Sequence, residues 1–296
     1  MSRDFLSIKD LTRNEIEELF GFAAGLKLSR KTHDKPLNNK TLGLVFEKPS
    51  NRTRVSFEVG MFELGGNTIY LGSDEIKLGK REAIKDAARV LSRYLDAMVI
   101  RTFSHDRLLE MAQHSSVPVI NGLTDLLHPC QALSDLFTIK EKKGLKDITL
   151  AFVGDGNNVL NSLLYGCSKL GVKINIACPK GYEPNKDILK NAGAFAKLFG
   201  SALDAVEGAD IVYTDVWASM GQEKEQKKRS RIFKPFQVNS KLLSLAKRNA
   251  VVMHCLPAHR GEEITDDVLD SRQSIVIDQA ENRLHLQKAI LVKLLQ

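Results

Sequence analysis

The chain has 296 residues, of which 43% are hydrophobic and 27% are charged, and its net charge is +7 at pH 7. This length suits two domains of ordinary size, and no apolar run approaches the length of a membrane-spanning helix. The first residues lack the apolar segment of a secretory signal, and the cysteines at 130, 167, 178 and 255 have no paired spacing. We therefore expect a cytoplasmic protein with reduced thiols, no zinc framework and no membrane association.

The positive charge favours an anionic ligand. The basic residues are spread along the chain, and there is no low-complexity tail and no aromatic motif of the kind that binds RNA. An anionic metabolite is therefore favoured over a nucleic acid.

Apolar runs alternate with helical stretches through the first half of the chain. Thr12 and Glu15 form a capping-box pattern that opens an amphipathic helix, and Ser50 is a plausible N-cap of the helix that follows the first strand. We predict strands at 42–46, 67–71, 97–100 and 117–120, and further helices at 52–64, 83–95, 106–114 and 130–142.

The polar segment 142–147 is the expected domain junction, and the pattern restarts after it. We predict strands at 148–153, 172–177, 210–214, 250–254 and 274–277, and helices at 157–170, 187–199 and 280–295. This alternation predicts an α/β protein with two doubly wound domains and parallel sheets. In such sheets, ligands bind at the carboxyl ends of the strands.

A candidate anion site follows the first strand. The run Ser50-Asn51-Arg52-Thr53-Arg54 opens a helix, whose first N–H groups and dipole favour negative charge, and Arg52 adds a fork suited to phosphate. The alternative is an ordinary serine N-cap with solvated arginines. Arg101 follows another strand, while His128 and Gln131 flank Pro129 at the start of a long helix, where His128 could donate to a carbonyl oxygen. The alternative here is a plain turn with proline at the first helical position.

The run Gly154-Asp155-Gly156-Asn157-Asn158 is similar to a dinucleotide-binding turn but fails its pattern. The third glycine position is Val159, and the next strand ends in Cys178-Pro179 with no acidic residue for a ribose. The tight turn is better explained as positioning Asn158, which could bind a zwitterionic head group.

Asp215 begins a run that ends at Gly221 and contains Ser219 and Met220. An aspartate at a strand end can pair with an ammonium group. The following segment 222–231 is highly charged and non-periodic, as expected for a mobile lid. For its individual lysines and arginines, Arg229 and Arg231 included, a solvated surface position is the favoured interpretation.

The run 254–263 has the highest density of reactive groups. It begins His254-Cys255-Leu256-Pro257 and places a thiol, two imidazoles and a guanidinium after an apolar strand. The alternative is a polar turn with a buried cysteine that behaves as a small hydrophobe.

Together these runs resemble the aspartate/ornithine carbamoyltransferase family over nearly the whole chain, from residues 46–50 to residues 279–283. The runs at 215–221 and 254–257 are most similar to those of the members that act on ornithine. Members that act on aspartate, acetylated ornithine or putrescine differ in these segments.

The resemblance implies transfer of the carbamoyl group from carbamoyl phosphate to the δ-amine of ornithine, a reaction of arginine biosynthesis, without metal or organic cofactor. It implies a carbamoyl-phosphate-binding domain at 1–142, to which helix 280–296 returns, and an ornithine-binding domain at 143–279. It implies a homotrimer with active sites at subunit interfaces, where the neighbour's loop 73–80 reaches the phosphate. The implied carbamoyl phosphate ligands are Ser50, Asn51, Arg52, Thr53, Arg101, His128 and Gln131, and the implied residues for ornithine and the reacting end are Asn158, Asp215, Ser219, Met220, Cys255, Leu256 and Arg283. Arg101, His128, Asp215 and Cys255 take the catalytic roles.

The sequence departs from the family pattern at three places. Asn51 stands where threonine is common, and Lys77 stands where ornithine enzymes often have glutamine. The stretch 199–207 is shortened, which puts one peripheral strand in doubt.

Three rival interpretations remain open from the sequence. A nicotinamide oxidoreductase is disfavoured by Val159 and Cys178. A basic nucleic-acid-binding module predicts an affinity that falls steeply with salt. Within the family, an aspartate or modified-ornithine carbamoyltransferase is the alternative.

Overall fold

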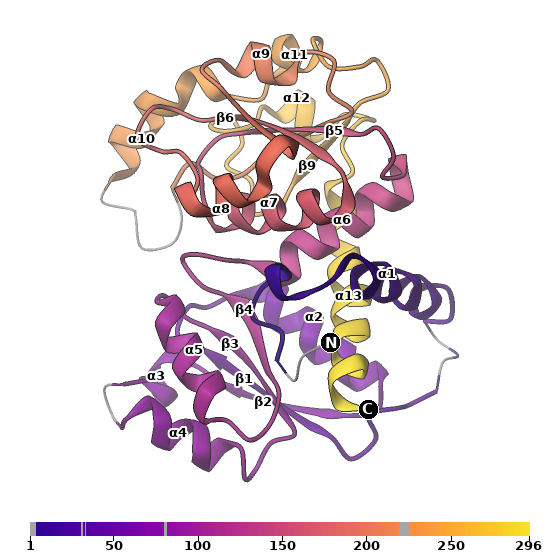
Figure 1. The fold of residues 1–296 in the computed structure, drawn as a ribbon, viewed down its shortest axis with the longest axis vertical. Helices are drawn as coiled ribbons and strands as arrows, with labels where there is room; N and C mark the ends of the chain where they lie inside the picture. Colours follow the sequence, from indigo (N-terminus) through magenta and orange to yellow (C-terminus); the bar gives the residue numbers. More distant parts are fainter. Residues whose placement is uncertain (1–3, 31, 33, 80–81, 219–224) are drawn as a thin grey trace. The chain divides into compact units, whose positions relative to one another are not determined.

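The computed structural model describes residues 4–30, 32, 34–79, 82–218 and 225–296. The chain forms two compact units (Figure 1), of which unit 1 comprises Met1–Ser134 and Asn282–Gln296, and unit 2 comprises Asp135–Glu281. Each unit is an α/β structure built on one parallel sheet, as the sequence predicts.

Unit 1 contains a four-stranded sheet with strand order β2-β1-β3-β4, and every strand pair in it is parallel. Its strands are β1 (Thr41–Phe46), β2 (Asn67–Leu71), β3 (Ala97–Arg101) and β4 (Val119–Leu123). Its helices include α1 (Arg13–Leu28), α2 (Asn51–Glu63), α3 (Ser73–Ile76), α4 (Ile84–Leu91) and α5 (His105–His114). Two longer helices, α6 (Pro129–Lys143) and α13 (Val276–Leu295), each contribute residues to both units.

The starts of α1 and α2 are determined locally, as predicted. Thr12 caps α1 in a reciprocal capping box with Glu15. The Ser50 hydroxyl accepts from the Thr53 N–H at 3.3 Å and caps α2. These side chains satisfy N–H groups that the first turn of a helix leaves unpaired.

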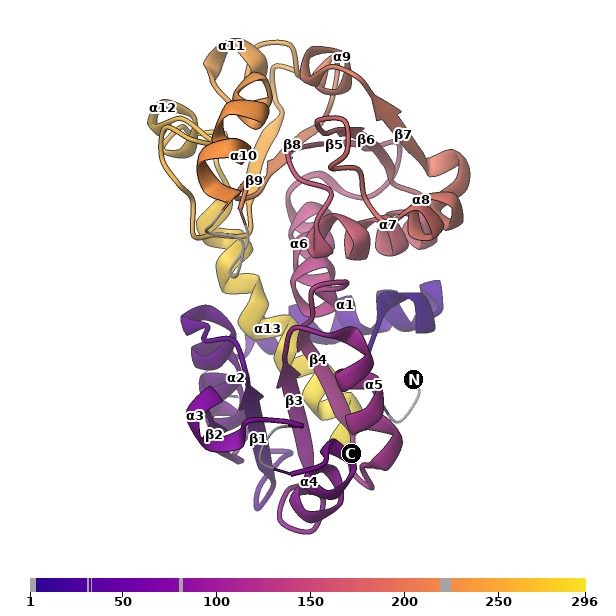
Figure 2. The same ribbon diagram turned by 90° about the vertical axis from the view of Figure 1, so that its left-hand side faces the viewer.

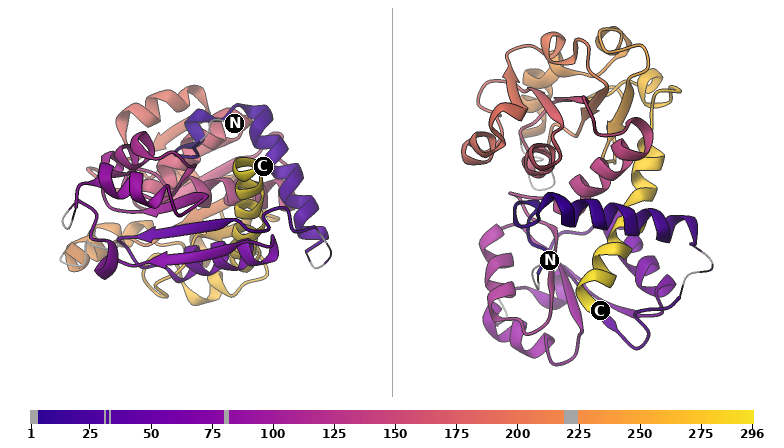
Figure 3. Two further views of the ribbon diagram at one scale, coloured as in Figure 1. Left: turned by 90° about the horizontal axis from the view of Figure 1, so that it is seen from below. Right: turned by 45° about the vertical axis from the view of Figure 1, so that its right-hand side comes forward.

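The C-terminal helix packs on the N-terminal unit, which confirms the prediction. Within unit 1, α13 lies beside α1 (Figure 3), where Lys27 donates to Asn282 at 2.8 Å and Lys293 pairs with Glu18 at 3.1 Å. The two ends of the chain thereby share one unit.

Unit 2 contains a five-stranded parallel sheet with order β7-β6-β5-β8-β9. Its strands are β5 (Thr149–Val153), β6 (Lys173–Ala177), β7 (Ala196–Phe199), β8 (Ile211–Thr214) and β9 (Val251–His254). Helices α7 (Asn158–Leu170) and α8 (Lys186–Ala192) lie on one face of the sheet (Figure 2), and α9 (Ala202–Val206) and α11 (Ser240–Leu243) lie on the other. Two further helices are α10 (Gln226–Phe233) and α12 (Asp266–Leu269).

Each sheet has a point where the strand order reverses. In unit 1 the chain enters at β1 and adds β2 on one side and β3 on the other; in unit 2 it enters at β5 and adds β6 on one side and β8 on the other. The crevice at the carboxyl ends of such strand pairs is the usual ligand site of open α/β sheets. The candidate residues after β1 and β3, and after β5 and β8, lie at the carboxyl ends of these strand pairs.

Three predicted elements need correction: the helix 187–199, the strand 274–277 and the end of the strand 117–120. The predicted helix 187–199 breaks at Gly193, which has a φ of +56°, and residues Ala196–Phe199 pair with β6 as the edge strand β7. That strand is the peripheral element that 199–207 had put in doubt. The predicted strand 274–277 is wrong, because Ser274 forms only an isolated bridge with Val252 and helix α13 already begins at Val276.

Strand β4 runs farther than predicted, because Asn121-Gly122 belongs to the strand and forms no turn. A side chain at Gly122 would meet the Val99 side chain at 2.9 Å, so the close approach of β4 to β3 requires glycine there. No helix in the described ranges is both long and apolar enough to span a membrane.

Candidate active site

One group of candidate residues, predicted to bind an anion, lies in unit 1 at the carboxyl ends of β1 and β3. Ser50 to Thr53 form the N-terminal turn of α2, and Arg101 is the last residue of β3. Arg101 is only 7% exposed, and its Nε donates to the Lys48 carbonyl oxygen at 3.2 Å. The helix start and the strand end therefore present N–H groups and a guanidinium from neighbouring elements.

His128 lies among positive charges. Burial lowers its pKa well below the usual range, and the charges of Arg283, Arg101 and Arg52 lower it further. A neutral imidazole donates one hydrogen bond without repelling the arginines. The structure thus brings together four of the predicted residues in one basic cluster, which suits a phosphate dianion.

Arg283 supports this cluster from α13. Its guanidinium is 3% exposed, and its two terminal nitrogens donate to the Thr53 hydroxyl at 3.0 Å and to the Gln131 side-chain oxygen. Arg283 therefore links the starts of α2 and α6 inside unit 1.

Sequence reasoning missed a supporting group, Glu47. Its carboxylate accepts from Thr102 and from Arg107, the latter at 2.8 Å, and its N–H donates to the Arg101 carbonyl oxygen at 2.8 Å. Glu47 therefore joins the ends of β1 and β3 on either side of Arg101. The position of Glu47 directly after a buried strand was the only sign of this role in the sequence.

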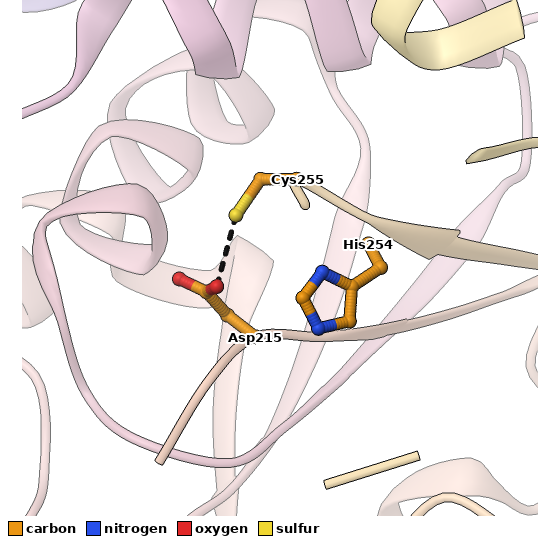
Figure 4. Close-up of side chains that lie close together, drawn as sticks. All are labelled: Asp215, His254 and Cys255. Carbon is orange, nitrogen blue, oxygen red and sulfur yellow. Dashed lines mark hydrogen bonds between the residues drawn. The ribbon is translucent and has the colours of Figure 1, made fainter. Parts of the chain in front are cut away.

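A second group of candidate residues lies in unit 2, at the carboxyl ends of β8 and β9. The Cys255 thiol donates to Asp215 Oδ1 at 2.9 Å (Figure 4), and the Val216 N–H donates to the same oxygen at 2.8 Å. Asp215 is 5% exposed, whereas Cys255 is half-buried and accessible. A buried carboxylate beside an accessible thiol can receive an ammonium group.

Asn157 also contacts this carboxylate and was missed in favour of its neighbour Asn158. Its Nδ2 donates to Asp215 Oδ2 at 2.6 Å, while its Oδ1 caps α7 by accepting from the N–H groups of Val159 and Leu160. Asn158 is the first residue of α7 and is half-buried. The N-cap position of Asn157 was visible in the sequence, but its second role depends on the sheet order.

His254 holds the loop that carries Cys255. Its Nδ1 accepts from the Leu256 N–H at 2.9 Å, so this nitrogen carries no proton, and its Nε2 lies 3.0 Å from the buried Glu263 carboxylate. Asp215, His254 and Cys255 offer potential metal-ligand atoms within 4.8 Å of one another. Both imidazole nitrogens are already engaged, however, so His254 suits the role of a loop anchor better than that of a ligand.

Leu256 follows Cys255 with a left-handed backbone, at a φ of 57°, and packs against the core of unit 2. A branched residue in this conformation is held there by its surroundings and is typical of functional loops. Ser219 and Met220, the remaining predicted ornithine ligands, lie outside the described residues.

The solvated position expected for Arg229 is wrong. Arg229 is 7% exposed and donates to Asp155 at 3.0 Å and to the Trp217 carbonyl oxygen at 2.8 Å. Its guanidinium also lies 4.8 Å from the Tyr182 ring centre. Burial raises the pKa of Asp155 to about 6, and the positive charge of Arg229 opposes that rise. A charged stretch of sequence gave no sign of which arginine would be buried.

Comparison with known protein families divides the chain in a similar way. Residues 3–141 match the carbamoyl-P binding domain of aspartate/ornithine carbamoyltransferases, and residues 146–294 match the Asp/Orn binding domain of the same family. The chain belongs to the aspartate/ornithine carbamoyltransferase family.

Relatives of the carbamoyltransferase family match along their full length. A protein of Syntrophus aciditrophicus named ornithine carbamoyltransferase is 53% identical over 98% of this chain and 99% of its own. One of Archaeoglobus fulgidus with the same name is 52% identical over 99% of this chain and 97% of its own. The solved ornithine carbamoyltransferase of Pyrococcus furiosus has a TM-score of 0.94 and 50% identity, and covers 97% of this chain and 95% of its own.

Within this carbamoyltransferase fold, the predicted residues fall into two groups. Ser50 to Thr53, Arg101, His128, Gln131 and Arg283 belong to unit 1, and Asn158, Asp215, Cys255 and Leu256 belong to unit 2. In unit 1, hydrogen bonds join Ser50 to Thr53, and Arg283 to Thr53 and Gln131, while Glu47 bonds the Arg101 backbone. In unit 2, hydrogen bonds join Cys255 and Asn157 to Asp215.

Proposed function

We propose that this protein transfers the carbamoyl group from carbamoyl phosphate to the δ-amine of L-ornithine, giving L-citrulline and phosphate. The observation that carries the proposal is the Cys255–Asp215 pair at 2.9 Å, which offers a carboxylate and a thiol to an amine inside the unit matched by the Asp/Orn binding domain. Relatives at 50–53% identity named ornithine carbamoyltransferase support ornithine as the acceptor.

We assign the two substrates to different parts of the chain. Residues 1–142 with 280–296 hold carbamoyl phosphate, and residues 143–279 hold ornithine. The carbamoyl phosphate ligands are Ser50, Asn51, Arg52, Thr53, Arg101, His128 and Gln131. The ornithine ligands are Asn158, Asp215, Ser219 and Met220. Cys255 and Leu256 line the reacting end, and Arg283 completes the site from the last helix. Bond formation requires the amine nitrogen to reach the carbonyl carbon.

The amine is the first obstacle to reaction. With a lysine-like pKa of about 10.4, deprotonation at pH 7.5 costs roughly 4 kcal/mol. Asp215 and Cys255 orient the amine. Because the Cys255 thiol already carries a proton, the proton of the amine passes to the Asp215 carboxylate or to the leaving phosphate. Cys255 forms no covalent intermediate, because phosphate is already a good leaving group and an acyl-enzyme would gain little.

The second obstacle is the negative charge that develops on the carbonyl oxygen. Thr53, Arg101 and His128 donate to it, and the loss of one such donor typically costs about 2.7–4 kcal/mol. Fixing two substrates in one geometry lowers the barrier by roughly 7–11 kcal/mol. This chemistry requires neither a metal nor an organic cofactor.

We infer that the active assembly is a homotrimer whose sites lie at subunit interfaces. Unit 1 exposes large apolar side chains on α2 and β2, where Val55, Phe62 and Ile69 are 54%, 78% and 47% exposed. Exposed apolar side chains on two elements that contact each other are typical of an interface. The loop 73–80 of an adjacent subunit completes the phosphate site, with Lys77, which caps α3 in a left-handed conformation, as its candidate cation. Light scattering after gel filtration tests the trimer.

We place the protein in the cytoplasm, since none of its four cysteines forms a disulfide. We place its reaction in arginine biosynthesis. A Campylobacter jejuni relative with 39% identity, described as an anabolic ornithine carbamoyltransferase, supports this direction.

Substitution of Arg101 tests the anion half. Arg101→Ala should lower citrulline formation by at least two orders of magnitude, because it removes a buried donor to the developing oxyanion, while the oligomer stays intact in light scattering. Turnover near the wild-type level would remove Arg101 from the site.

Substitution of Cys255 tests the amine half. Cys255→Ser should raise the KM for ornithine and leave the KM for carbamoyl phosphate largely unchanged. A selective loss of carbamoyl phosphate binding would overturn the assignment of Cys255 to the amine.

A further inference from the structure

A buried polar network in unit 2 lies next to the Cys255–Asp215 pair. It contains Asp135 of α6, Tyr213 of β8 and Gln279 of α13, which are 0%, 0% and 1% exposed. The Tyr213 hydroxyl donates to Asp135 Oδ2 at 2.9 Å, and Gln279 Nε2 donates to Asp135 Oδ1 at 2.7 Å. One buried carboxylate therefore holds two other elements by hydrogen bonds to a charged acceptor, which are stronger than neutral ones.

Gln279 extends this network to the backbone that precedes Cys255. Its Oε1 accepts from the His254 N–H at 3.0 Å, and its Nε2 also donates to the Tyr213 hydroxyl at 3.1 Å. The amide has one orientation, because its oxygen faces a backbone donor while its nitrogen faces two acceptors. The last residue of β9 is thereby fixed immediately before the thiol.

The same network reaches Asp215 through β8. Tyr213 precedes Asp215 by two residues, and its ring stacks on Phe152 of the neighbouring strand β5 at 5.4 Å. Burial and the charge of Asp135 raise the pKa of Tyr213 well above its usual range, with smaller contributions from Cys255 and Asp215. The phenol thus keeps its proton and remains a donor to Asp135.

We propose that Asp135, Tyr213 and Gln279 are positioning residues that set the geometry of Cys255 and Asp215 and thereby the affinity for the amine substrate. The inference rests on the proposed function, in which these two side chains receive that amine. The strand before Asp215 is bonded to the Asp135 carboxylate through Tyr213, and the last residue of the strand before Cys255 is bonded to it through Gln279. Because a partly satisfied buried network is costly, the bonded arrangement is strongly preferred.

Two substitutions test this role against a matched control. Tyr213→Phe removes one hydroxyl, and Gln279→Met removes the amide at similar size. Asn175→Val is the control: it removes a half-buried side-chain hydrogen bond, to the Ala205 carbonyl oxygen at 3.1 Å, on β6, which pairs with neither β8 nor β9. Circular dichroism first establishes that all three variants are folded.

The first readout is the rate at which iodoacetamide alkylates Cys255, followed by peptide mass spectrometry. Cys130 and Cys167 are fully buried and Cys178 is 6% exposed, so early labelling reports on Cys255. Both network variants should change this rate at least threefold relative to Asn175→Val. The KM for ornithine should rise at least fivefold, while the KM for carbamoyl phosphate changes less than twofold.

Alkylation rates and ornithine KM values within twofold of the control in both network variants would overturn the proposal. If Gln279→Met does not fold, Tyr213→Phe decides the question alone. Failure of the wild type to form citrulline would overturn the proposed function instead, and the alkylation comparison separates that outcome from failure of the network.

Discussion

Removal of the Arg229 guanidinium should leave a charge buried in unit 2. Arg229 pairs with Asp155 at 3.0 Å, and their side chains are 8% and 10% exposed. In Arg229→Met the Asp155 carboxylate keeps its burial and loses its cation. Breaking a buried pair from one side typically costs about 3–5 kcal/mol. At roughly 2–4 °C per kcal/mol, the thermal midpoint at pH 7.5 should fall by roughly 6–20 °C.

The pH dependence gives a second, independent signature. Burial raises the pKa of Asp155 from 3.8 to about 6 even with Arg229 present. Because the folded pKa lies above the unfolded one, the contribution of this group to stability is greatest below about pH 4 and falls by about 3 kcal/mol as pH rises through about 6. Loss of Arg229 raises this pKa further, so Arg229→Met should regain much of its stability at pH 5.5.

Thermal unfolding followed by circular dichroism at pH 5.5 and pH 7.5 measures both effects. Arg231→Met is the matched control, since Arg231 lies on the same helix and is exposed. This substitution should change the free energy of unfolding by no more than about 0.5 kcal/mol. The double variant Asp155→Asn/Arg229→Met should recover stability, because the unpaired charge is gone. A midpoint for Arg229→Met equal to that of Arg231→Met at pH 7.5 would show that the Arg229–Asp155 pair does not stabilise the fold.

Three further predictions concern the two halves of the site. Asn157→Ala should raise the KM for ornithine at least tenfold, because it removes the 2.6 Å bond to Asp215. Asn185→Ala removes the same kind of N-cap from α8 and should affect stability only. Equal KM values for the two variants would contradict the assignment of Asn157. Burial lowers the pKa of His128 well below 6.5, so the folded protein keeps this imidazole neutral and its stability should fall as pH drops below about 6.5. In His128→Gln, the thermal midpoint should depend less on pH in this range. An unchanged pH dependence of the midpoint would contradict the burial of a neutral His128. Arg283→Met should raise the KM for carbamoyl phosphate at least tenfold in steady-state kinetics, and an unchanged KM would show that its bonds to Thr53 and Gln131 do not hold the anion half together.

Much of the fold follows from local sequence signals. Capping by Thr12 and Ser50 and the alternation of apolar strands with helices predict both sheets, because these signals act within a few residues. The missed edge strand β7 was marked only by Gly193. The predicted end of β4 was too early, because Gly122 belongs to the strand and allows β4 to pack closely against β3. This packing depends on a residue distant in the sequence.

The candidate site was predictable where a residue stands directly at a strand end, as Asp215 and Cys255 do. It was less predictable where a role depends on partners distant in the sequence. Asn157 meets Asp215 only because β5 and β8 are neighbours in the sheet, and Arg229 is buried only because Asp155 and Trp217 receive it. No local pattern distinguishes Arg229 from the charged residues around it.

Carbamoyl phosphate and ornithine are the proposed substrates. One colorimetric assay of ureido products, with carbamoyl phosphate and an equal concentration of ornithine, aspartate, acetylornithine or putrescine, tests this proposal most directly. We expect kcat/KM with ornithine to exceed that with each other amine by at least a hundredfold, with phosphate released in equal amount. A higher kcat/KM with aspartate, acetylornithine or putrescine, or no ureido product from ornithine, would contradict it.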